Sequence, residues 1–202
     1  MTTIVNILFA GLLLAGPQWF AQRIGLVQPM EKEELNDQPE AAVFAAGCFW
    51  GVEHFFAAVP GVLTTEVGYM GGTLKHPTYR QVCRGDTNHA EVVRLTFDPD
   101  RVSYETLVEL FFKMHDPTTR NRQGPDIGSQ YRSAVFYYSD AQHRTARAVI
   151  HRLTRQKAFR RPIVTEVTCA ADFWRAEDYH QQYFKNNPAR SCHITFSPAM
   201  LP

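Results

Sequence analysis

The sequence predicts an α/β fold in which helices pack on a mixed β-sheet as two layers. Short apolar runs bounded by Gly and Pro recur between segments whose apolar residues repeat at helical spacing. The two kinds of segment interleave without strict alternation, which favours a mixed sheet over a purely parallel one. The chain has 202 residues, 45% hydrophobic and 12% aromatic, which is enough apolar side chain for the core of one domain.

The expected elements follow one another from residue 42 onward. Apolar runs predict strands at 42–46, 63–68, 90–97, 132–138 and 163–168. Helical periodicity predicts helices at 49–59, which ends at Pro60-Gly61, at 103–112, capped by Ser103, at 141–157, capped by Asp140, and at 176–184. In the helix at 141–157, we expect Ala148, Val149 and Leu153 to face inward.

The N-terminal segment, residues 1–28, differs from the rest. From Ile4 to Ala15 it is apolar except for Asn6. About 12 residues are too few to span a bilayer, which needs ~20, but they match the apolar region of a secretory signal. No Lys or Arg precedes the run. Two interpretations stay open: a signal or anchor that places the protein in the cell envelope or periplasm, and an apolar start, or start-site artefact, of a cytoplasmic protein.

Residues 29–40 are charged, flanked by Pro and poor in apolar residues, so they are predicted to be a linker. The globular domain is then expected at 41–202.

Charge and cysteine content exclude several classes of protein. Lys and Arg number 21 and Asp and Glu number 20, and this balance of +1 gives no electrostatic footprint for nucleic acid. Four Cys are too few for a disulfide-dense scaffold, and none forms a C-x-x-C motif. Structural zinc, a thioredoxin-type redox pair and c-type haem attachment therefore lack their usual signatures.

The most informative segment runs from Gly47 to Gly51 and contains Cys48, Phe49 and Trp50. A strand is predicted before it and a helix after it, so Cys48 lies at a helix N-terminus. The N–H groups and macrodipole there stabilise a thiolate, which makes Cys48 a candidate nucleophile. A buried, inert Cys is the alternative. The neighbouring aromatics are either core residues or the wall of a small apolar pocket.

Two polar clusters supply partners for such a thiol. Glu91 stands at the start of an apolar strand, where burial would raise its pKa and make it a proton donor; a solvated strand end is the alternative. Asp126 and Tyr131 belong to a loop shaped by Gly and Pro, and Tyr79 belongs to the cluster before Glu91. These three side chains either bind a polar substrate oxygen or cap loops.

The remaining cysteines differ in their surroundings. Cys192 follows an Asn-Pro element near the C-terminus, where a mobile chain could bring it to another sulfur; a spectator thiol is the alternative. Cys83 and Cys169 fall on or beside strand patterns, so both are expected to be buried spectators.

The segment Gly47–Gly51 also carries a resemblance. With the runs GYMGG at 68–72, HPTYRQVCRGDTNHAE at 76–91, QGPDIGSQYRSA at 123–134 and AEDYHQQY at 176–183, the chain resembles the type A peptide methionine sulfoxide reductases from about residue 41 to Cys192. The resemblance implies an α/β two-layer sandwich with a mixed sheet and a ferredoxin-like plait core.

The resemblance also implies a role for each matching residue. Cys48 matches the nucleophile that attacks the sulfoxide sulfur, and Glu91 matches the acid that protonates the sulfoxide oxygen. The family residues that bind this oxygen match Tyr79, Asp126 and Tyr131. Those that receive the substrate methyl group match Phe49 and Trp50. Cys192 resembles the resolving cysteine, which would form a disulfide with the Cys48 sulfenic acid.

These roles imply a repair oxidoreductase that reduces the S form of methionine sulfoxide, free or in proteins, and needs no metal or organic cofactor. Thioredoxin or another dithiol would recycle it. Oxidised proteins and peptides would be its other partners, and a monomer is expected. Many relatives carry a glycine-rich tail with a further Cys. The ten residues after Cys192 lack one, so a two-cysteine cycle is expected.

Two other functions remain as alternatives. One is a thiol hydrolase or acyltransferase with Cys48 paired to His89 or His54. The other is a membrane-attached binding module without activity. The chain contains no papain- or caspase-type signature for the first. The intact set of Cys48, Glu91, Tyr79, Asp126 and Tyr131 argues against the second.

Overall fold

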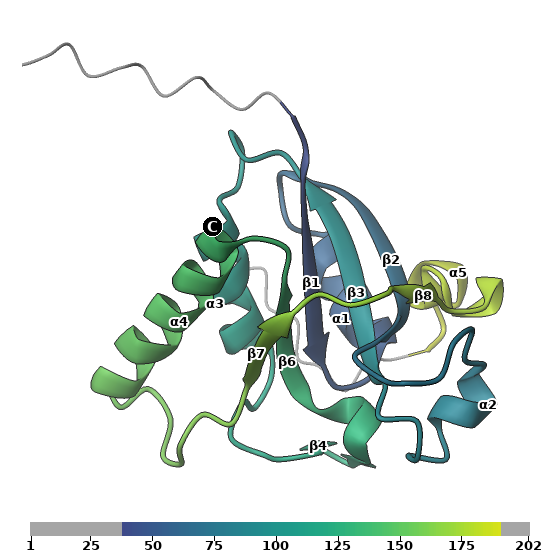
Figure 1. Ribbon diagram of the computed structural model, residues 1–202. Coiled ribbons are helices and arrows are strands. Elements are labelled where there is room, and N and C mark those ends of the chain that lie inside the picture. The colour runs from purple at the N-terminus through teal and green to yellow at the C-terminus, as the bar shows by residue number, and fades with distance from the viewer. Residues whose placement is uncertain (1–37, 191–202) are drawn as a thin grey trace, which may run out of the picture. The chain divides into compact units, whose positions relative to one another are not determined.

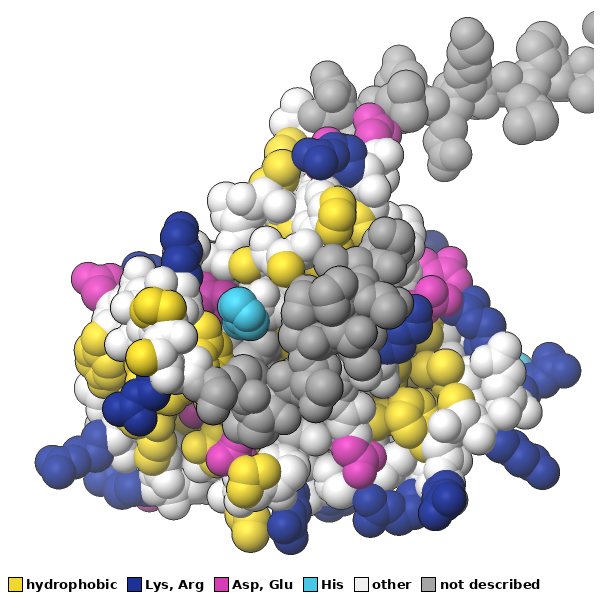
Figure 2. Space-filling model, turned by 180° about the vertical axis from the view of Figure 1, so that it is seen from behind, with side chains coloured by type: hydrophobic (Ala, Val, Ile, Leu, Met, Phe, Trp, Pro, Cys, Tyr) yellow, Lys and Arg dark blue, Asp and Glu magenta, His cyan; other side chains and the backbone are white. Residues whose placement is uncertain are grey.

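The computed structural model describes residues 38–190 (Figure 1). The segment at 1–28, most of the linker at 29–40 and Cys192 lie outside the described residues. Within 38–190, no helix is both long and apolar enough to cross a membrane. Basic side chains (Lys or Arg) and acidic side chains (Asp or Glu) both occur on the face seen in Figure 2.

Six strands form one mixed sheet in the order β7-β6-β1-β3-β2-β8. They are β1 (Glu40–Ala46), β2 (Val62–Met70), β3 (Ala90–Phe97), β6 (Ser133–Tyr137), β7 (Glu166–Cys169) and β8 (Trp174–Arg175). Every neighbouring pair is antiparallel except β6 and β7. A separate hairpin pairs β4 (Arg122–Gln123) with β5 (Asp126–Ile127).

The helices are α1 (Phe49–Ala57), α2 (Tyr79–Val82), α3 (Tyr104–Met114), α4 (Asp140–Arg155) and α5 (Tyr183–Asn186). Helix α1 connects β1 to β2, and α3 lies between β3 and β6, while the four central strands lie in the order β6-β1-β3-β2. Two crossovers, each with another strand inserted between the strands it joins, define the ferredoxin-like plait. The predicted fold class is therefore confirmed.

Both faces of the sheet are covered. On β1, Ala42, Phe44 and Ala46 contribute to the core cluster that also holds the apolar residues of α1, α3 and α4. Val43 and Ala45 belong to a second cluster on the opposite face. The chain between β7 and β8 crosses that face in Figure 1. Burial on both sides explains why β1 reads as a continuous apolar run rather than an alternating one.

Local predictions have mixed outcomes. The Ser103 cap is confirmed, since its Oγ accepts a hydrogen bond from the Thr106 N–H at 3.1 Å. The Asp140 cap is wrong: Ser139 caps α4, accepting from the Gln142 N–H at 3.2 Å. Ala148 is exposed, while Val149 is buried as expected and Leu153 packs against the core while partly buried.

The later part of the chain differs most from expectation. The strand expected at 163–168 forms at Glu166–Cys169. The helix expected at 176–184 is broken into a 3-10 turn at Asp178–His180 and the single turn α5. Gln182 separates the two with a φ of 52°, a left-handed conformation that an α-helix cannot continue through.

Candidate active site

Cys48 is the residue immediately before α1, where the chain leaves β1 through Gly47. Gly47 has a φ of 96°, and a Cβ at this position would lie 2.7 Å from two side-chain carbons of Gln123. Only glycine combines this backbone conformation with this close approach. The turn therefore places the Cys48 side chain at the end of the sheet, beside the start of β3.

A pocket of about 310 Å³ opens at this point. Every predicted site residue among residues 38–190 lines it; the eighth, Cys192, lies outside the described residues. The described lining residues are Cys48, Phe49, Trp50, Gly51, Tyr79, Glu91, Asp126, Tyr131, Tyr183, Phe184 and Arg190. They come from segments up to 142 positions apart, which the fold brings to one end of the sheet.

Glu91 is the second residue of β3 and is only 2% exposed. Its Oε2 accepts a hydrogen bond from the Phe49 N–H at 3.0 Å, so it lies against the start of α1. Burial raises the pKa of Glu91 to about 8, and the negative charge of Asp126 adds to the rise. The carboxyl therefore carries its proton at neutral pH. It can donate that proton inside the pocket, as the sequence predicts.

The Cys48 thiol corrects an expectation. Burial, and next the negative charge of Glu91, raise the pKa of Cys48 to about 12. Hydrogen bonds from the Trp50 and Gly51 N–H groups act in the opposite direction, as a helix N-terminus should, but they are outweighed. The resting pocket therefore holds a neutral thiol, because desolvation penalises the thiolate more than the helix N-terminus stabilises it.

Two phenols face the same space. Tyr79 begins α2, and Tyr131 ends a 3-10 turn at Ser129–Tyr131 just before β6. Burial, with the nearby charge of Glu91, raises the pKa of both hydroxyls, so both remain protonated hydrogen-bond donors. Asp126 reaches the pocket from the β4–β5 hairpin.

Aromatic side chains form the other wall. Phe49 is buried beneath the pocket, and Trp50 is partly exposed. The Trp50 Nε1–H donates to Nδ1 of His180 at 3.0 Å. Tyr183 stacks on the Trp50 indole with ring centroids 3.7 Å apart and an interplanar angle of 7°. These contacts fix the indole in one orientation.

Sequence reasoning assigned no role to His180, Tyr183 or Glu177. Glu177 accepts hydrogen bonds from the Tyr69 hydroxyl at 3.0 Å and from the Tyr79 N–H at 2.9 Å, so it anchors α2 at the pocket. All three belong to the polar run at 176–183, but nothing in its pattern indicates which side chains turn toward α1.

The expectation that Cys83 and Cys169 are buried is wrong. Cys83 and Cys169 are exposed, because Cys83 follows α2 and Cys169 ends the edge strand β7. Cys83 nevertheless lies near the pocket, since its thiol shares a hydrogen bond with the Tyr79 hydroxyl.

The histidines of the hydrolase alternative are engaged elsewhere. His89 is buried. Its Nδ1 accepts from the Gly72 N–H at 3.1 Å, and its Nε2 lies 2.7 Å from the Leu74 carbonyl oxygen. His54 packs edge-on against Phe184. No histidine is among the described residues that line the pocket. In residues 38–190, no group of three or more His, Cys, Asp or Glu could hold a metal ion.

The fold and pocket place a cysteine thiol beside a buried carboxylic acid. Comparison with known proteins identifies the family: a family model described as peptide methionine sulfoxide reductase matches residues 40–201. The chain belongs to this family and is an oxidoreductase, which confirms the resemblance seen in its motifs.

Two relatives named peptide methionine sulfoxide reductase MsrA illustrate the similarity. The one from Methanosarcina mazei is 54% identical over 159 residues, which cover 77% of this chain and 75% of that relative. The one from Methanothermobacter thermautotrophicus is 56% identical over 155 residues, which cover 77% of this chain and 92% of that relative.

Solved structures agree. Reduced Mxr1 from Saccharomyces cerevisiae aligns with a TM-score of 0.73 at 33% identity, covering 79% of this chain and 92% of that one. Methionine sulfoxide reductase A of Corynebacterium diphtheriae aligns with a TM-score of 0.72 at 37% identity, covering 81% and 83%. Mxr1 has also been solved in complex with Trx2. That Mxr1 chain aligns with a TM-score of 0.51 at 23% identity, covering 72% of this chain and 85% of that one.

Proposed function

We propose that this protein reduces methionine S-sulfoxide, free or in proteins, with Cys48 as the nucleophile and Glu91 as the proton donor. The observation that carries the proposal is a neutral buried carboxyl beside a partly buried thiol in one pocket of a reductase-family chain. A sulfoxide oxygen is a poor leaving group until it is protonated, so the acid and the sulfur must act together.

The pocket suits both halves of this substrate. The S-methyl group would lie against Phe49 and Trp50, where apolar contact stabilises it. The oxygen would then face Glu91 and the two phenols Tyr79 and Tyr131, which donate hydrogen bonds to it, directly or through water. Because a sulfoxide sulfur is chiral, a pocket with these two walls accepts one epimer.

The chemical step is balanced. Glu91 transfers its proton to the sulfoxide oxygen, and the Cys48 sulfur attacks the substrate sulfur. In the net reaction, the bond between oxygen and substrate sulfur breaks and an S–O bond forms on Cys48. The substrate is reduced to the thioether, Cys48 is oxidised to a sulfenic acid, and the thiol proton returns the Glu91 carboxylate to its acid form.

The high pKa of the resting thiol fits this order of events. Protonating the oxygen places positive charge beside the Cys48 sulfur, and nearby positive charge lowers the pKa of a thiol. The N–H groups of Trp50 and Gly51 already point toward that sulfur. The nucleophile is thus formed when substrate is bound and stays unreactive otherwise.

The second half of the cycle uses Cys192. Its thiolate would attack the sulfenic sulfur and release water to form a Cys48–Cys192 disulfide, which thioredoxin would then reduce, so electrons come from a dithiol rather than a bound cofactor. Cys192 follows the pocket-lining residue Arg190 by two positions. The solved complex of the related Mxr1 with Trx2 supports a thioredoxin partner.

Single-turnover reduction of separated sulfoxide epimers tests the activity. Reduced enzyme without added reductant should convert the S epimer only, and a dimedone probe should label the sulfenic acid on Cys48 in the Cys192→Ser variant. That variant should keep one stoichiometric reduction but lose thioredoxin-driven turnover, while Cys169→Ser serves as the matched control. Absence of reduction by the native chain, or full turnover by Cys192→Ser, would overturn the corresponding half of the proposal.

A further inference from the structure

The helix turn α5 lacks a cap of its own. The first N–H groups of any helix have no partner within the helix. Gln182 precedes α5, and its side chain makes no capping hydrogen bond. A carboxylate from α1 takes that place instead: Glu53 Oε2 accepts from the Gln182 N–H at 2.7 Å, and Glu53 also accepts from the Tyr183 N–H.

The same face of α1 also holds the Tyr183 side chain. Trp50 and Glu53 are three residues apart, so they are neighbours on the helix surface. Trp50 stacks on the Tyr183 ring, and Glu53 binds the backbone of the same residue. Helix α1 thus contacts Tyr183 at two points, through the Trp50 ring and the Glu53 carboxylate. Tyr183 and the following Phe184 line the pocket.

Glu53 is an unusual residue for its location. It is only 2% exposed, and burial raises its pKa to about 6 even with hydrogen bonds from Gln182, Thr65 and Tyr183. A buried carboxylate is costly, so the hydrogen bonds it accepts must be retained. Thr65 of β2 donates to its Oε1 at 3.2 Å.

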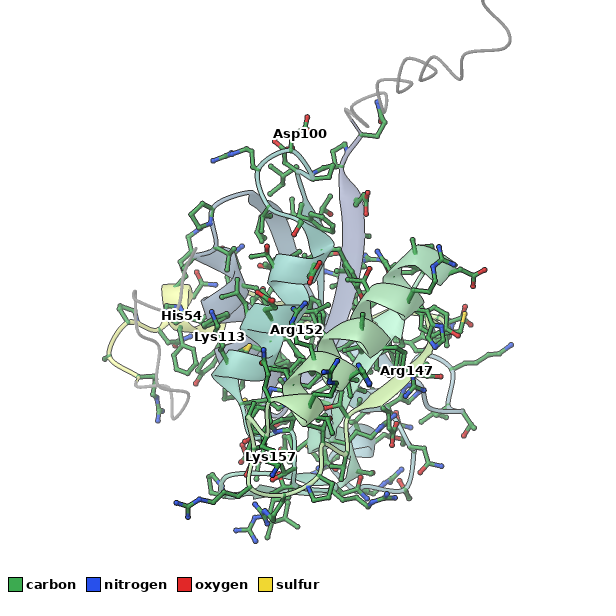
Figure 3. All side chains as sticks on the ribbon, turned by 90° about the vertical axis from the view of Figure 1, so that its left-hand side faces the viewer. His54, Asp100, Lys113, Arg147, Arg152 and Lys157 are labelled. Carbon is green, nitrogen blue, oxygen red and sulfur yellow. The ribbon has the colours of Figure 1, made fainter. Side chains whose placement is uncertain are left out.

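The titratable groups around Glu53 come from two elements. His54 of α1 and Tyr183 and Lys185 of α5 line the small cavity beside it, together with Thr65 of β2. Figure 3 shows His54 close to the α5 segment. The Lys185 ammonium donates to the Gln182 side chain at 2.9 Å.

We propose that Glu53 is a positioning residue whose carboxylate fixes the backbone at Gln182 and Tyr183, keeps Tyr183 on Trp50 and so completes the wall of the substrate pocket. The inference rests on the proposed function, because the pocket is taken to bind a methionine sulfoxide. Glu53 itself does not line that pocket.

The Glu53→Gln variant tests this role. Its amide cannot accept as strongly from two N–H groups, so we expect the KM for a methionine sulfoxide peptide to rise about tenfold, while kcat stays within about twofold. Between pH 7 and 5, the KM of the native chain should rise as Glu53 takes up a proton. The ratio of variant to native KM should therefore fall toward one at low pH.

The matched control is Thr65→Val, which removes the other hydrogen bond of Glu53 and leaves the α5 contacts in place. Its KM should stay within about twofold of the native value. In a Tyr183→Ala background, Glu53→Gln should have no further effect on KM, since Glu53 acts through Tyr183. Glu53→Asp, which retains the charge but shortens the reach, serves as the second variant if Glu53→Gln fails to fold.

One readout does not depend on catalysis. Acrylamide quenching of the Trp50 fluorescence, obtained by difference from Trp50→Phe, should increase in Glu53→Gln. If the native chain reduced no methionine sulfoxide but Glu53→Gln still increased the quenching, the proposed function would be rejected and the positioning role of Glu53 would stand. An unchanged KM and unchanged quenching, an equal effect of Thr65→Val, or additive effects with Tyr183→Ala would overturn the positioning role.

Discussion

The side chains of Glu53 and Glu91 are both 2% exposed, yet their surroundings leave Glu53 ionised and Glu91 neutral at pH 7. Burial raises the pKa of Glu53 to about 6 and that of Glu91 to about 8. Glu53 accepts hydrogen bonds from two backbone N–H groups and the Thr65 hydroxyl. Glu91 accepts one from Phe49 and lies near the negative charge of Asp126.

The difference between these two pKa values shows how one fold can give two carboxyl groups different roles. Hydrogen bonds to the anion lower a carboxyl pKa, whereas desolvation and nearby negative charge raise it. At pH 7, Glu53 is therefore ionised and acts as an anchor, while Glu91 is protonated and can act as an acid. The stronger desolvation of Glu91, the charge of Asp126 beside it and the additional donors around Glu53 together separate the two roles.

The largest expected effect comes from removing the Glu91 proton. Glu91→Gln preserves an acceptor for the Phe49 N–H but has no proton to donate, so the rate of sulfoxide reduction should fall about 10²–10⁴-fold. Single-turnover kinetics measure it. Glu105→Gln is the control, because Glu105 is an exposed carboxylate paired with Arg152 on the outer helices. A loss below about tenfold would reject Glu91 as the acid.

The second prediction concerns pH. Reduction needs Glu91 in its protonated form, so the single-turnover rate at saturating substrate should fall about tenfold per pH unit above pH 8. In Glu91→Gln this fall should disappear, since the group that titrates is gone. A native profile that stays level from pH 7 to 10 would show that the pKa of another group controls the step.

A third buried group, His115, extends the comparison to a residue that does not line the pocket. The His115 Nδ1 lies 2.6 Å from the Phe111 carbonyl oxygen and its Nε2 lies 2.7 Å from the Ser133 hydroxyl, so both ring nitrogens have partners. Burial lowers its pKa to about 4. His115→Phe should lower the free energy of unfolding by about 1–3 kcal/mol and leave kcat within about twofold.

Denaturant titration measures this loss. Ser133→Ala removes one of the two His115 hydrogen bonds and also the hydrogen bond between the Ser133 and Thr165 hydroxyls, so it should cost about 1–2 kcal/mol. If His115→Phe lost activity while remaining as stable as the native chain, His115 would belong with the reactive group rather than with the structural ones.

The last prediction concerns the pH dependence of stability rather than activity. The pKa of Glu91 is raised from 4.5 to about 8 on folding, so the folded state binds this proton more tightly. The resulting stability is present below pH 4.5 and is lost as pH rises through 8. Glu91→Gln removes this loss, so the free energy of unfolding of the variant relative to that of the native chain should rise by about 3–4 kcal/mol between pH 5 and 8. Urea titrations at the two pH values measure it, and a difference that falls with pH would reverse the assigned sign.

Packing across the surface helices supports the fold without touching this chemistry. Arg152 of α4 contacts Glu105 at 2.7 Å and also pairs with Glu109, both on α3 (Figure 3). These exposed pairs contribute little individually. The apolar periodicity of α3 and α4 predicted both helices, whereas no local pattern predicted the contacts of Glu177, His180 and Tyr183 near the pocket.

The local sequence determined most helices and strands and which reactive side chains the chain contains. The run at 42–46 is apolar because β1 is buried on both faces, and Ser103 caps α3 through a hydrogen bond that spans three residues. Gly47 and Cys48 could be identified because the strand-to-helix turn is encoded in adjacent residues. Such features depend on near neighbours, which a sequence displays directly.

Tertiary structure alone decided the protonation state of Cys48 and the contacts that hold α5 against the pocket. The pKa of Cys48 depends on burial and on Glu91, 43 positions away, so its helix position alone predicted the wrong direction. The cap of α5 comes from Glu53, 129 positions before Gln182. Desolvation and through-space hydrogen bonds act between groups that only the folded chain brings together, and no local pattern records them.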